Sequence, residues 1–576
     1  MEERALLAIV LSLLIIIGYQ FLFVSKGQKI PLKLPDKAVK ESQPVENIED
    51  TGLKPIDREI EINELREPLK EIIKLQEQRR VENINFETDR YKTILTNKNA
   101  SFKSWELKKF KATPEYTTSV LKKAFWSQVL QEYKNYFFNK NREINQLSNI
   151  DLVSKLTDND LKSDDFLNLK LLDPELNDFG IGNYDFKFIS ENKIEFIFID
   201  SKGLQITKSL EFNENDYQVK LNIEIKNLTQ KKINKDYFLV WEQIFDESEG
   251  RGHRNFIGAG FFLNNKKKSF KIGKIKDTIK NNYNIGWISL ENNYFTSCII
   301  PLQDDHESII LKKRINEKYS KLSIGIKYPS KLILPGSIVK DEYLIYMGPK
   351  LERELVKVDQ NLKYVINYGF FSFLARPTIL LLRFIYKYIP NYGWAIILLT
   401  ILTKIIFYPL TEKSFQSMKK MQTLQPKIAE IKKKYKNDMV QINQETMALY
   451  KEHHVNPMGG CLPMLIQIPV FFALYEALLV AIEIRGAPFM FWITDLSAMD
   501  PLLITPIIMG VTMFFQQKTM STSIDPAQAK LFAIMPIMFT FFFLGFPSGL
   551  VLYWMLNNIL TIGHQYIVNK INVKKS

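Results

Sequence analysis

A lysine lies inside a strongly apolar segment in the last third of the chain. Lys404 falls within Trp394–Pro409, which otherwise consists mainly of Ile, Leu, Ala and aromatic residues. Thr400 precedes Lys404 by four residues, so the two side chains share one helix face, and Thr403 flanks them. A cation within a membrane span is costly and commonly belongs to a functional site. This stripe therefore predicts a polar site that attracts an anionic group and faces protein or water.

Lys404 also has a simpler interpretation. It lies about six residues from the end of its segment, or roughly 9 Å deep at helical rise. A long lysine stem can reach the lipid headgroups from that depth. The depth of Lys404 is compatible with both a functional site and a lysine that reaches the headgroups. The neighbouring threonines favour the functional, polar site.

Polar and amphipathic residues recur on the later apolar segments. They are Gln516, Gln517, Tyr553, Trp554, Asn557, Asn558 and Thr561. Such residues often only join helices to one another. Together with a buried cation, they indicate a water-containing cavity instead.

Glu476 is the obvious carboxylate to test as a partner of Lys404. It lies about 15 residues from the cytoplasmic end of its segment, or roughly 22 Å, against roughly 9 Å for Lys404. This difference in depth argues against a direct pair. We expect Glu476 nearer the outer face, either protonated or bonded to Tyr475 or to a neighbouring helix.

Six apolar segments have the length and composition of membrane-spanning helices. One, Ala5–Val24, is an N-terminal anchor, since Glu2 and Glu3 are not typical of a cleaved signal peptide. The other five are residues 393–410, 461–482, 501–516, 530–546 and 548–566. The sequence therefore predicts a six-span helical membrane bundle.

Positive charge sets the expected orientation of these spans. The segment 411–460 reads as a polar hairpin of two antiparallel helices and carries nine lysines, and Lys570, Lys574 and Lys575 follow the last span. The positive-inside rule makes this side cytoplasmic, with both termini. Lysines after the first span argue for the opposite orientation, but the hairpin is richer in positive charge.

The middle of the chain has the pattern of strands. Period-two alternation occurs in 184–190, 193–199 and 217–225, and Asn, Asp and Gly clusters separate these runs. Such spacing predicts an antiparallel all-β domain, a β-sandwich, on the extracytoplasmic side.

Five regions follow from these patterns. They are an N-terminal transmembrane anchor (1–27), a charged linker (28–85), the β-sandwich domain (86–346), an interfacial amphipathic helix (347–390) and a core of five transmembrane helices with the cytoplasmic hairpin (391–576). In the amphipathic region, Arg376, Arg383 and Lys387 share one face, and Pro377 is expected to break the helix.

Signals of catalysis are poor. His453 and His454 lack the context of a metal site, and Ser548–Gly549 lacks the pattern of a nucleophile. The two cysteines, Cys298 and Cys461, are assigned to different compartments, which excludes a disulfide. We therefore expect no enzyme activity and no cofactor. The net charge of +14 lies largely beside apolar spans, so anionic lipid is the expected partner of the basic residues.

The C-terminal 200 residues resemble the YidC family of membrane protein insertases. The resemblance rests on Leu424–Ile428, Met447–Lys451, Val455–Phe471, Leu496–Pro501, Met509–Phe515 and Phe546–Trp554. The β region is similar, more weakly, to the periplasmic domain of Gram-negative members, through Gly286–Ser289 and Tyr294–Thr296.

This resemblance implies a hydrophilic groove in which an intramembrane cation attracts the polar end of an incoming segment. The apolar helix of that segment then enters lipid along the third and fifth spans. The groove residues map to Lys404, Thr400, Gln517 and Trp554. Family members usually carry Arg at the position of Lys404, and an apolar or aromatic residue at the position of Glu476.

The resemblance also implies partners and a location. It implies an inner-membrane insertase and chaperone that acts on nascent membrane proteins, alone or with the Sec translocon. The basic density of the hairpin, apart from the resemblance, also suits contact with a ribosome or a targeting factor. From the residues alone, the alternatives are a secondary transporter of a small anion and an intramembrane peptidase. The absence of a repeated half disfavours the first, and the absence of a nucleophile and base disfavours the second.

Overall fold

The computed structural model describes most of the chain after residue 66. The described residues are 67–111, 149–153, 169–172, 178–247, 256–276, 278–281, 285–303, 307–316, 318–435, 438–455, 462–520 and 526–573. The predicted N-terminal anchor lies outside them, as do most of the linker and Cys461. The described residues belong to two compact units, one containing Glu412–Leu462 and the other containing Glu64–Thr411 with Pro463–Ser576.

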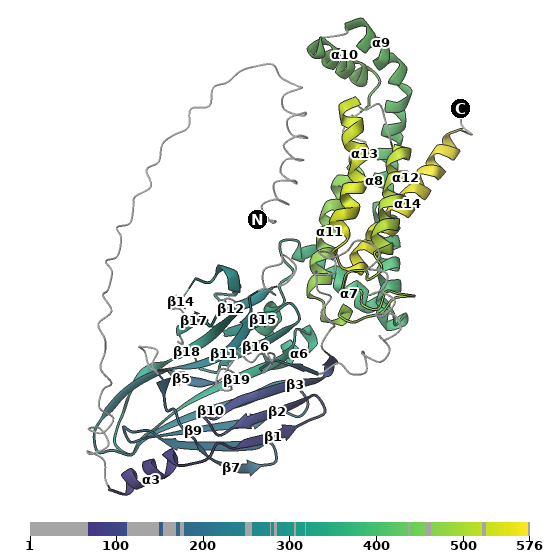
Figure 1. Cartoon of the computed structure of the whole chain (residues 1–576). Helices are drawn as coiled ribbons and strands as arrows, with labels where there is room; N and C mark the ends of the chain where they lie inside the picture. Colours follow the sequence, from purple (N-terminus) through teal and green to yellow (C-terminus); the bar gives the residue numbers. More distant parts are fainter. Residues whose placement is uncertain are drawn as a thin grey trace, which may run out of the picture. The chain divides into compact units, whose positions relative to one another are not determined.

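Antiparallel strands form the first half of the larger unit (Figure 1). A four-stranded sheet has the order β1 (Asn83–Glu87), β2 (Tyr91–Thr96), β3 (Ser101–Lys111) and β4 (Asn149–Asp151). A six-stranded sheet has the order β14 (Thr278–Asn281), β17 (Glu307–Arg314), β18 (Tyr319–Ile333), β11 (Ile233–Asp246), β5 (Lys170–Leu172) and β6 (Asp178–Phe179).

The largest sheet has nine strands. Its order is β13 (Lys266–Lys271), β12 (Ile257–Leu263), β15 (Trp287–Asn292), β16 (Phe295–Pro301), β19 (Ile338–Pro349), β10 (Gln218–Asn227), β9 (Leu204–Phe212), β8 (Lys193–Ile199) and β7 (Asp185–Ser190). The three runs with period-two alternation are found here as β7, β8 and β10. Along β10, buried residues alternate strictly with half-buried ones, as the pattern predicts.

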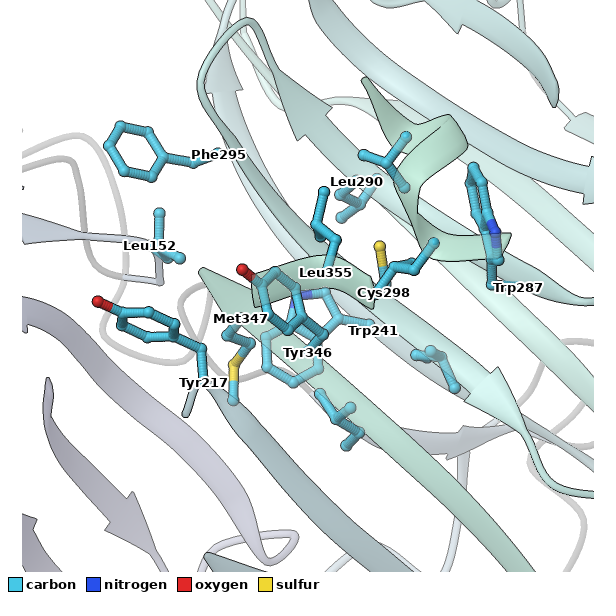
Figure 2. Close-up of a cluster of buried hydrophobic side chains, with 14 of the residues drawn as sticks. Leu152, Tyr217, Trp241, Trp287, Leu290, Phe295, Cys298, Tyr346, Met347 and Leu355 are labelled. Atoms are coloured by element: carbon cyan, nitrogen blue, oxygen red, sulfur yellow. The ribbon is translucent and has the colours of Figure 1, made fainter. Parts of the chain in front are cut away.

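The sheets share one buried core (Figure 2). Trp241 of β11 and Tyr346 of β19 come from different sheets, and Leu355 of helix α6 (Glu352–Val358) joins the same cluster. The thiol of Cys298 is buried there and free, and burial raises its pKa to about 12. The cysteine therefore acts as a small apolar core residue.

A fully buried lysine fixes two backbone segments against this core. The Lys208 ammonium, on β9, donates to the carbonyl oxygens of Asn99 (2.7 Å) and Leu169 (3.1 Å). Both residues have positive φ, 58° and 70°, which is strained for residues other than glycine. The ring of Tyr184 lies 5.2 Å from the ammonium. Burial lowers the pKa of Lys208 to about 7, because it penalises the charged form.

Helices form the second half of the larger unit. They are α7 (Ser372–Tyr388), α8 (Tyr392–Thr423), whose last turns from Glu412 on belong to the smaller unit, α11 (Leu462–Val480), α12 (Ile504–Met520), α13 (Pro526–Phe543) and α14 (Ser548–Val573). Two short 3₁₀ segments, η4 (Gln360–Val365) and η6 (Ile482–Ile484), accompany them, and a third, η3 (Ile272–Lys274), lies between β13 and β14. Helix α3 (Glu67–Glu77) precedes the strands. Helices thus occupy all five C-terminal segments that were predicted to be helical spans. Within the described part of the chain, α8 is the one helix both long and apolar enough to cross a membrane by length and composition alone.

The amphipathic region 347–390 differs from its prediction in two respects. It is not one helix, because α6 and η4 precede α7, which begins at Ser372. Pro377 lies inside α7 and does not break it. A proline removes one backbone hydrogen bond of the preceding turn, and the packing of the buried Ala375, Ile379 and Leu382 on both sides of Pro377 keeps the helix continuous. Two of the three predicted basic residues bind protein groups. Arg376 lies over the rings of Tyr364 and Tyr368, and Arg383 forms ion pairs.

The hairpin, taken by itself, contains the two predicted helices, α9 (Gln425–Tyr435) and α10 (Met439–Glu452). Lys427 contacts His453 at 3.3 Å, and the Tyr435 hydroxyl contacts Glu445 at 3.4 Å. The first pair joins the start of α9 to the end of α10, and the second joins the end of α9 to an earlier residue of α10. The two helices are therefore antiparallel. Asp438 caps the start of α10 by accepting from two backbone N–H groups.

The buried lysine makes a testable prediction about pH. In the unfolded chain Lys208 titrates near its ordinary pKa of 10.5, so between about pH 7 and pH 10 the unfolded state binds more protons than the folded state. Folding stability should therefore rise with pH across this window, by a few kcal/mol at ~1.4 kcal/mol per unit. Lys208→Met should remove this rise.

Denaturant unfolding of the full chain, followed by tryptophan fluorescence at several pH values, measures the effect. Lys103→Met, at an exposed position of β3, is the matched control and should keep the rise. An equal pH dependence in the Lys208 variant and the control would contradict the assignment.

Candidate functional site

The polar stripe on α8 consists of one buried residue, Thr400, and two half-buried ones, Thr403 and Lys404. Thr400 is 0% exposed, and its hydroxyl donates to the carbonyl of Ile396 at 2.7 Å. The Thr403 hydroxyl donates to the carbonyl of Thr400 at 2.8 Å. Both threonines therefore satisfy their own donors within the helix. Thr400 is turned toward protein, and Thr403 is half-buried.

The Lys404 ammonium reaches across to α14. Its Nζ donates to the hydroxyl oxygen of Thr561 at 2.7 Å, and that hydroxyl donates in turn to the carbonyl of Asn557 at 2.6 Å. A threonine hydroxyl has one donor and two acceptor sites. The bond to Asn557 therefore turns an acceptor site of Thr561 toward the ammonium.

Among the residues that the structure describes, no carboxylate matches the charge of Lys404. Among the described residues, its one hydrogen-bond partner is the neutral hydroxyl of Thr561, and no described carboxylate forms an ion pair with it. A lysine ammonium has three donors. Within the described part of the chain, two N–H groups of this half-buried cation therefore have no acceptor.

Helix α14 also binds α12 and α8 through polar side chains. Asn558, 2% exposed, lies 3.3 Å from the Thr512 hydroxyl and 3.5 Å from the Met509 carbonyl on α12. One turn beyond Lys404, the ring of Tyr408 stacks on His564 of α14, with centroids 4.7 Å apart. Three helices therefore meet along a polar seam whose centre is α14.

Gln467 of α11 belongs to the same interior, although its sequence position gave no signal. Its side chain hydrogen-bonds with the hydroxyl of Tyr553, a buried residue of α14. The Gln467 amide nitrogen is buried and has no partner among the described residues. No polar residue lies four positions before or after Gln467. The sequence therefore shows only a single glutamine in a mainly apolar segment, which by itself does not indicate a site.

Trp554 lies in a separate, aromatic zone. Its ring contacts Phe471 of α11 edge-on at 4.8 Å, and Phe543 and Phe539 of α13 at 5.4 and 6.3 Å. Trp554 precedes Thr561 by seven residues, or roughly 10 Å along α14. The sequence placed Trp554 and Lys404 in one site, and the structure distributes them between an aromatic and a polar zone of the same helix.

The other two predicted residues have clear positions. Gln517 is half-buried in the last turns of α12. The Glu476 carboxylate accepts from the backbone N–H of Phe371, just before α7, at 3.2 Å. As predicted from depth, Glu476 is not the partner of Lys404, and its partner is the start of a neighbouring helix.

Two of the motifs singled out in the sequence bind each other. The N–H of Ser548 donates to the Ala498 carbonyl at 2.7 Å, and that of Gly549 donates to the Leu496 carbonyl at 3.0 Å. The Ser548 hydroxyl donates to the Asp495 carbonyl at 2.9 Å, so this serine has a structural partner. No group of three or more His, Cys, Asp or Glu side chains in the described residues could hold a metal ion.

Comparison with known proteins agrees with this architecture. Residues 384–575 match the family model of the 60Kd inner membrane protein, and residues 184–381 match that of the YidC periplasmic domain. A membrane protein insertase YidC of Geotalea uraniireducens (strain Rf4) is 36% identical over 576 residues, covering 99% of each chain. That of Syntrophus aciditrophicus (strain SB) is 45% identical over 388 residues, covering 67% of this chain and 71% of the relative. A crystal structure of an active YidC insertase with its first transmembrane domain resolved is 18% identical, with a TM-score of 0.35 over 85% of this chain and 93% of that one.

The helical core, the β domain and the two matched models define an inner-membrane protein with a periplasmic domain. The chain belongs to the YidC family of membrane protein insertases, because a relative more than 30% identical to it is covered almost completely. Its function is membrane protein insertion, and its substrates are membrane proteins. The comparisons do not support the alternative of an anion transporter.

The aromatic zone makes a prediction about stability. Trp554→Ala should cost about 2–4 kcal/mol, because it leaves a cavity between α11, α13 and α14. Trp554→Phe should cost less, since a ring remains. Thermal unfolding of the purified full chain, followed by helical circular dichroism, measures the difference. Trp394→Ala removes an exposed tryptophan of α8 and is the control; equal losses at both positions would contradict the packing described.

Proposed function

We propose that the chain inserts membrane proteins through a hydrophilic groove that contains Lys404, Thr400, Gln517 and Trp554. The observation that carries this proposal is the half-buried Lys404 ammonium, whose one partner among the described residues is a neutral hydroxyl. In a low-dielectric interior, such a charge attracts a carboxylate far more strongly than it would in water. Lys404 therefore draws in the acidic end of an incoming segment, without catalysis and without a cofactor.

The aromatic zone is the exit route in this proposal. The apolar helix of the client passes from the polar seam toward Trp554 and enters lipid between α11, the third span, and α13, the fifth. Phe471, Phe539 and Phe543 give this route an apolar surface that accepts varied side chains. Reversible contact with such a surface also supports a chaperone role in folding membrane proteins.

The proposed topology has six spans. The N-terminal anchor (1–27) and the five helices of residues 391–576 cross the inner membrane, with both termini and the hairpin in the cytoplasm. The β domain (86–346), a sandwich of packed sheets, is periplasmic and follows the charged linker (28–85), and α7, within 347–390, lies at the interface. The basic excess of the hairpin supports this orientation.

The proposed partners follow from the position of the charges. The lysines of the hairpin bind anionic lipids and contact a ribosome or a targeting factor. The chain acts alone or beside the Sec translocon.

The charge of Lys404 is the decisive test. Lys404→Arg should keep insertion, because it keeps a cation, while Lys404→Gln and Lys404→Glu should lose most insertion of clients with acidic N-terminal tails. Clients with neutral tails should lose less. Thr561→Val is the matched control, since it removes the hydroxyl partner but keeps the charge, and its loss should be smaller than that of Lys404→Gln. Insertion into proteoliposomes at equal protein levels is the measurement.

A lysine that only reaches the headgroups makes the opposite prediction. In that case Lys404→Gln would insert an acidic-tailed client as well as the parent chain does, and the electrostatic mechanism would be wrong.

The hairpin lysines make a prediction about salt. Lys432, Lys433 and Lys434 are exposed in the last turn of α9. Replacing all three by Gln should weaken binding to anionic vesicles or ribosomes mainly at low ionic strength, because exposed charges are screened within about 10 Å at 0.1 M salt. Replacing all three by Arg is the control and should keep binding. A loss that is the same at low and high salt would exclude electrostatic recruitment.

A further inference from the structure

Helix α7 begins without a cap from its own sequence. Phe371 occupies the position before its first residue, and its side chain makes no capping hydrogen bond. The first backbone N–H groups of a helix have no partner within the helix. Here Glu476 of α11 supplies one, because its carboxylate accepts from the N–H of Phe371 at 3.2 Å and also from that of Phe370. A carboxylate at this end of a helix is also favoured by the helix dipole.

The backbone before α7 is shaped to admit this carboxylate. Gly369 has a φ of +66°, a conformation that favours glycine. A Cβ atom at Gly369 would lie 2.2 Å from a Glu476 oxygen, which is closer than any van der Waals contact. The contact therefore depends on a glycine on one helix and an acid on the other.

The same turn of α11 also holds the ring of Phe371. Phe472 lies four residues before Glu476 and stacks on Phe371, with centroids 5.8 Å apart and planes 10° apart. The adjacent residue, Phe471, contacts Trp554. Neighbouring residues of α11 thus connect α7 to the aromatic zone of the candidate site.

A second attachment lies near the other end of α7. The guanidinium of Arg383 pairs with Glu483 of η6 at 2.7 Å and with Glu352 of α6 at 3.7 Å. Glu483 follows the end of α11 by three residues. Helix α7 is therefore bound at two points to one continuous segment, from Phe472 to Glu483.

We propose that Glu476 is a positioning residue that locks α7 to α11, so that the two helices move as one body while a client passes between α11 and α13. Separating α7 from α11 would leave the Glu476 carboxylate in an apolar helix without its backbone donors, and a carboxylate without partners in such surroundings is costly. The inference rests on the exit route proposed above. It adds a third helix, α7, to the two helices that line the proposed exit route, and α7 moves together with α11.

The test uses the full chain with Cys298→Ser and Cys461→Ser as background. Glu476→Ala should lower client insertion several-fold, while Glu476→Gln should keep most of it, because an amide oxygen still accepts from Phe371. Gly369→Ala should act like Glu476→Ala, since it displaces the carboxylate. Gly486→Ala is its matched control: Gly486 has a φ of +70°, so the strain is the same, but a Cβ there meets nothing within 4 Å.

Reversible crosslinking separates positioning from a folding defect. Phe371→Cys and Phe472→Cys, joined by a short thiol-cleavable crosslinker, should restore insertion to the Glu476→Ala variant, and cleavage of the linker should abolish the rescue. With Glu476 present, the same crosslink should leave insertion unchanged. If that crosslink stops insertion, α7 and α11 must separate and the proposal is overturned; it is equally overturned if Glu476→Ala inserts normally or is not rescued.

A distance measurement without any client distinguishes this proposal from the insertion route. Spin labels at Leu380 on α7 and Leu479 on α11 should give a narrow distance distribution that Glu476→Ala broadens and Glu476→Gln does not. An unchanged distribution in Glu476→Ala would overturn the lock. If the distribution broadens while the Lys404 variants insert normally, the lock stands and the groove mechanism fails.

Discussion

An ammonium group placed among apolar helices must find hydrogen-bond partners, because its hydration is lost and a low dielectric raises the cost of an unpaired charge. Lys404 satisfies this constraint in part, through Thr561. Several other polar side chains of the helical bundle also have hydrogen-bond partners. Thr400 and Thr403 bond to their own helix, Asn558 bonds to α12, and Thr561 is fixed by the Asn557 carbonyl. The polar side chains of α8 and α12 thus meet those of α14, and the Lys404 ammonium, which no described carboxylate pairs, belongs to the seam that they form.

Helix α14 divides this interior into two zones because its polar and aromatic residues lie about two turns apart. Near Thr561 the neighbours are a cation and amides, and near Trp554 they are the phenylalanines of α11 and α13. A client segment has the same division, with a polar end and an apolar helix. In the proposed mechanism, this match between the arrangement of the bundle and the client segment is the physical basis for insertion.

Buried charges in the β domain, outside the helical core, obey the same constraint. Glu291 is fully buried between Lys267 and Lys350. Burial alone would raise the pKa of this carboxyl, but the two ammonium groups outweigh it and hold the pKa below its ordinary value. Among the described residues, Lys208 pairs with no carboxylate and donates to two backbone carbonyls, and burial lowers its pKa. Fixed partners therefore replace water at both buried groups, but only the paired carboxylate is stabilised in its charged form.

The sequence by itself determined what depends on neighbours along the chain. Period-two alternation located β7, β8 and β10, apolar runs located the five C-terminal helices, and the cost of a cation in an apolar run singled out Lys404 before any contact was known. The short sequence motifs of the C-terminal 200 residues were also sufficient to identify the family. Only the tertiary structure decided which residues meet. Lys404 and Thr561 are 157 residues apart, so their contact depends on how α8 packs against α14. The Glu476 contact to Phe371, the continuation of α7 through Pro377 and the burial of Lys208 likewise depend on packing between distant segments, which local periodicity does not encode.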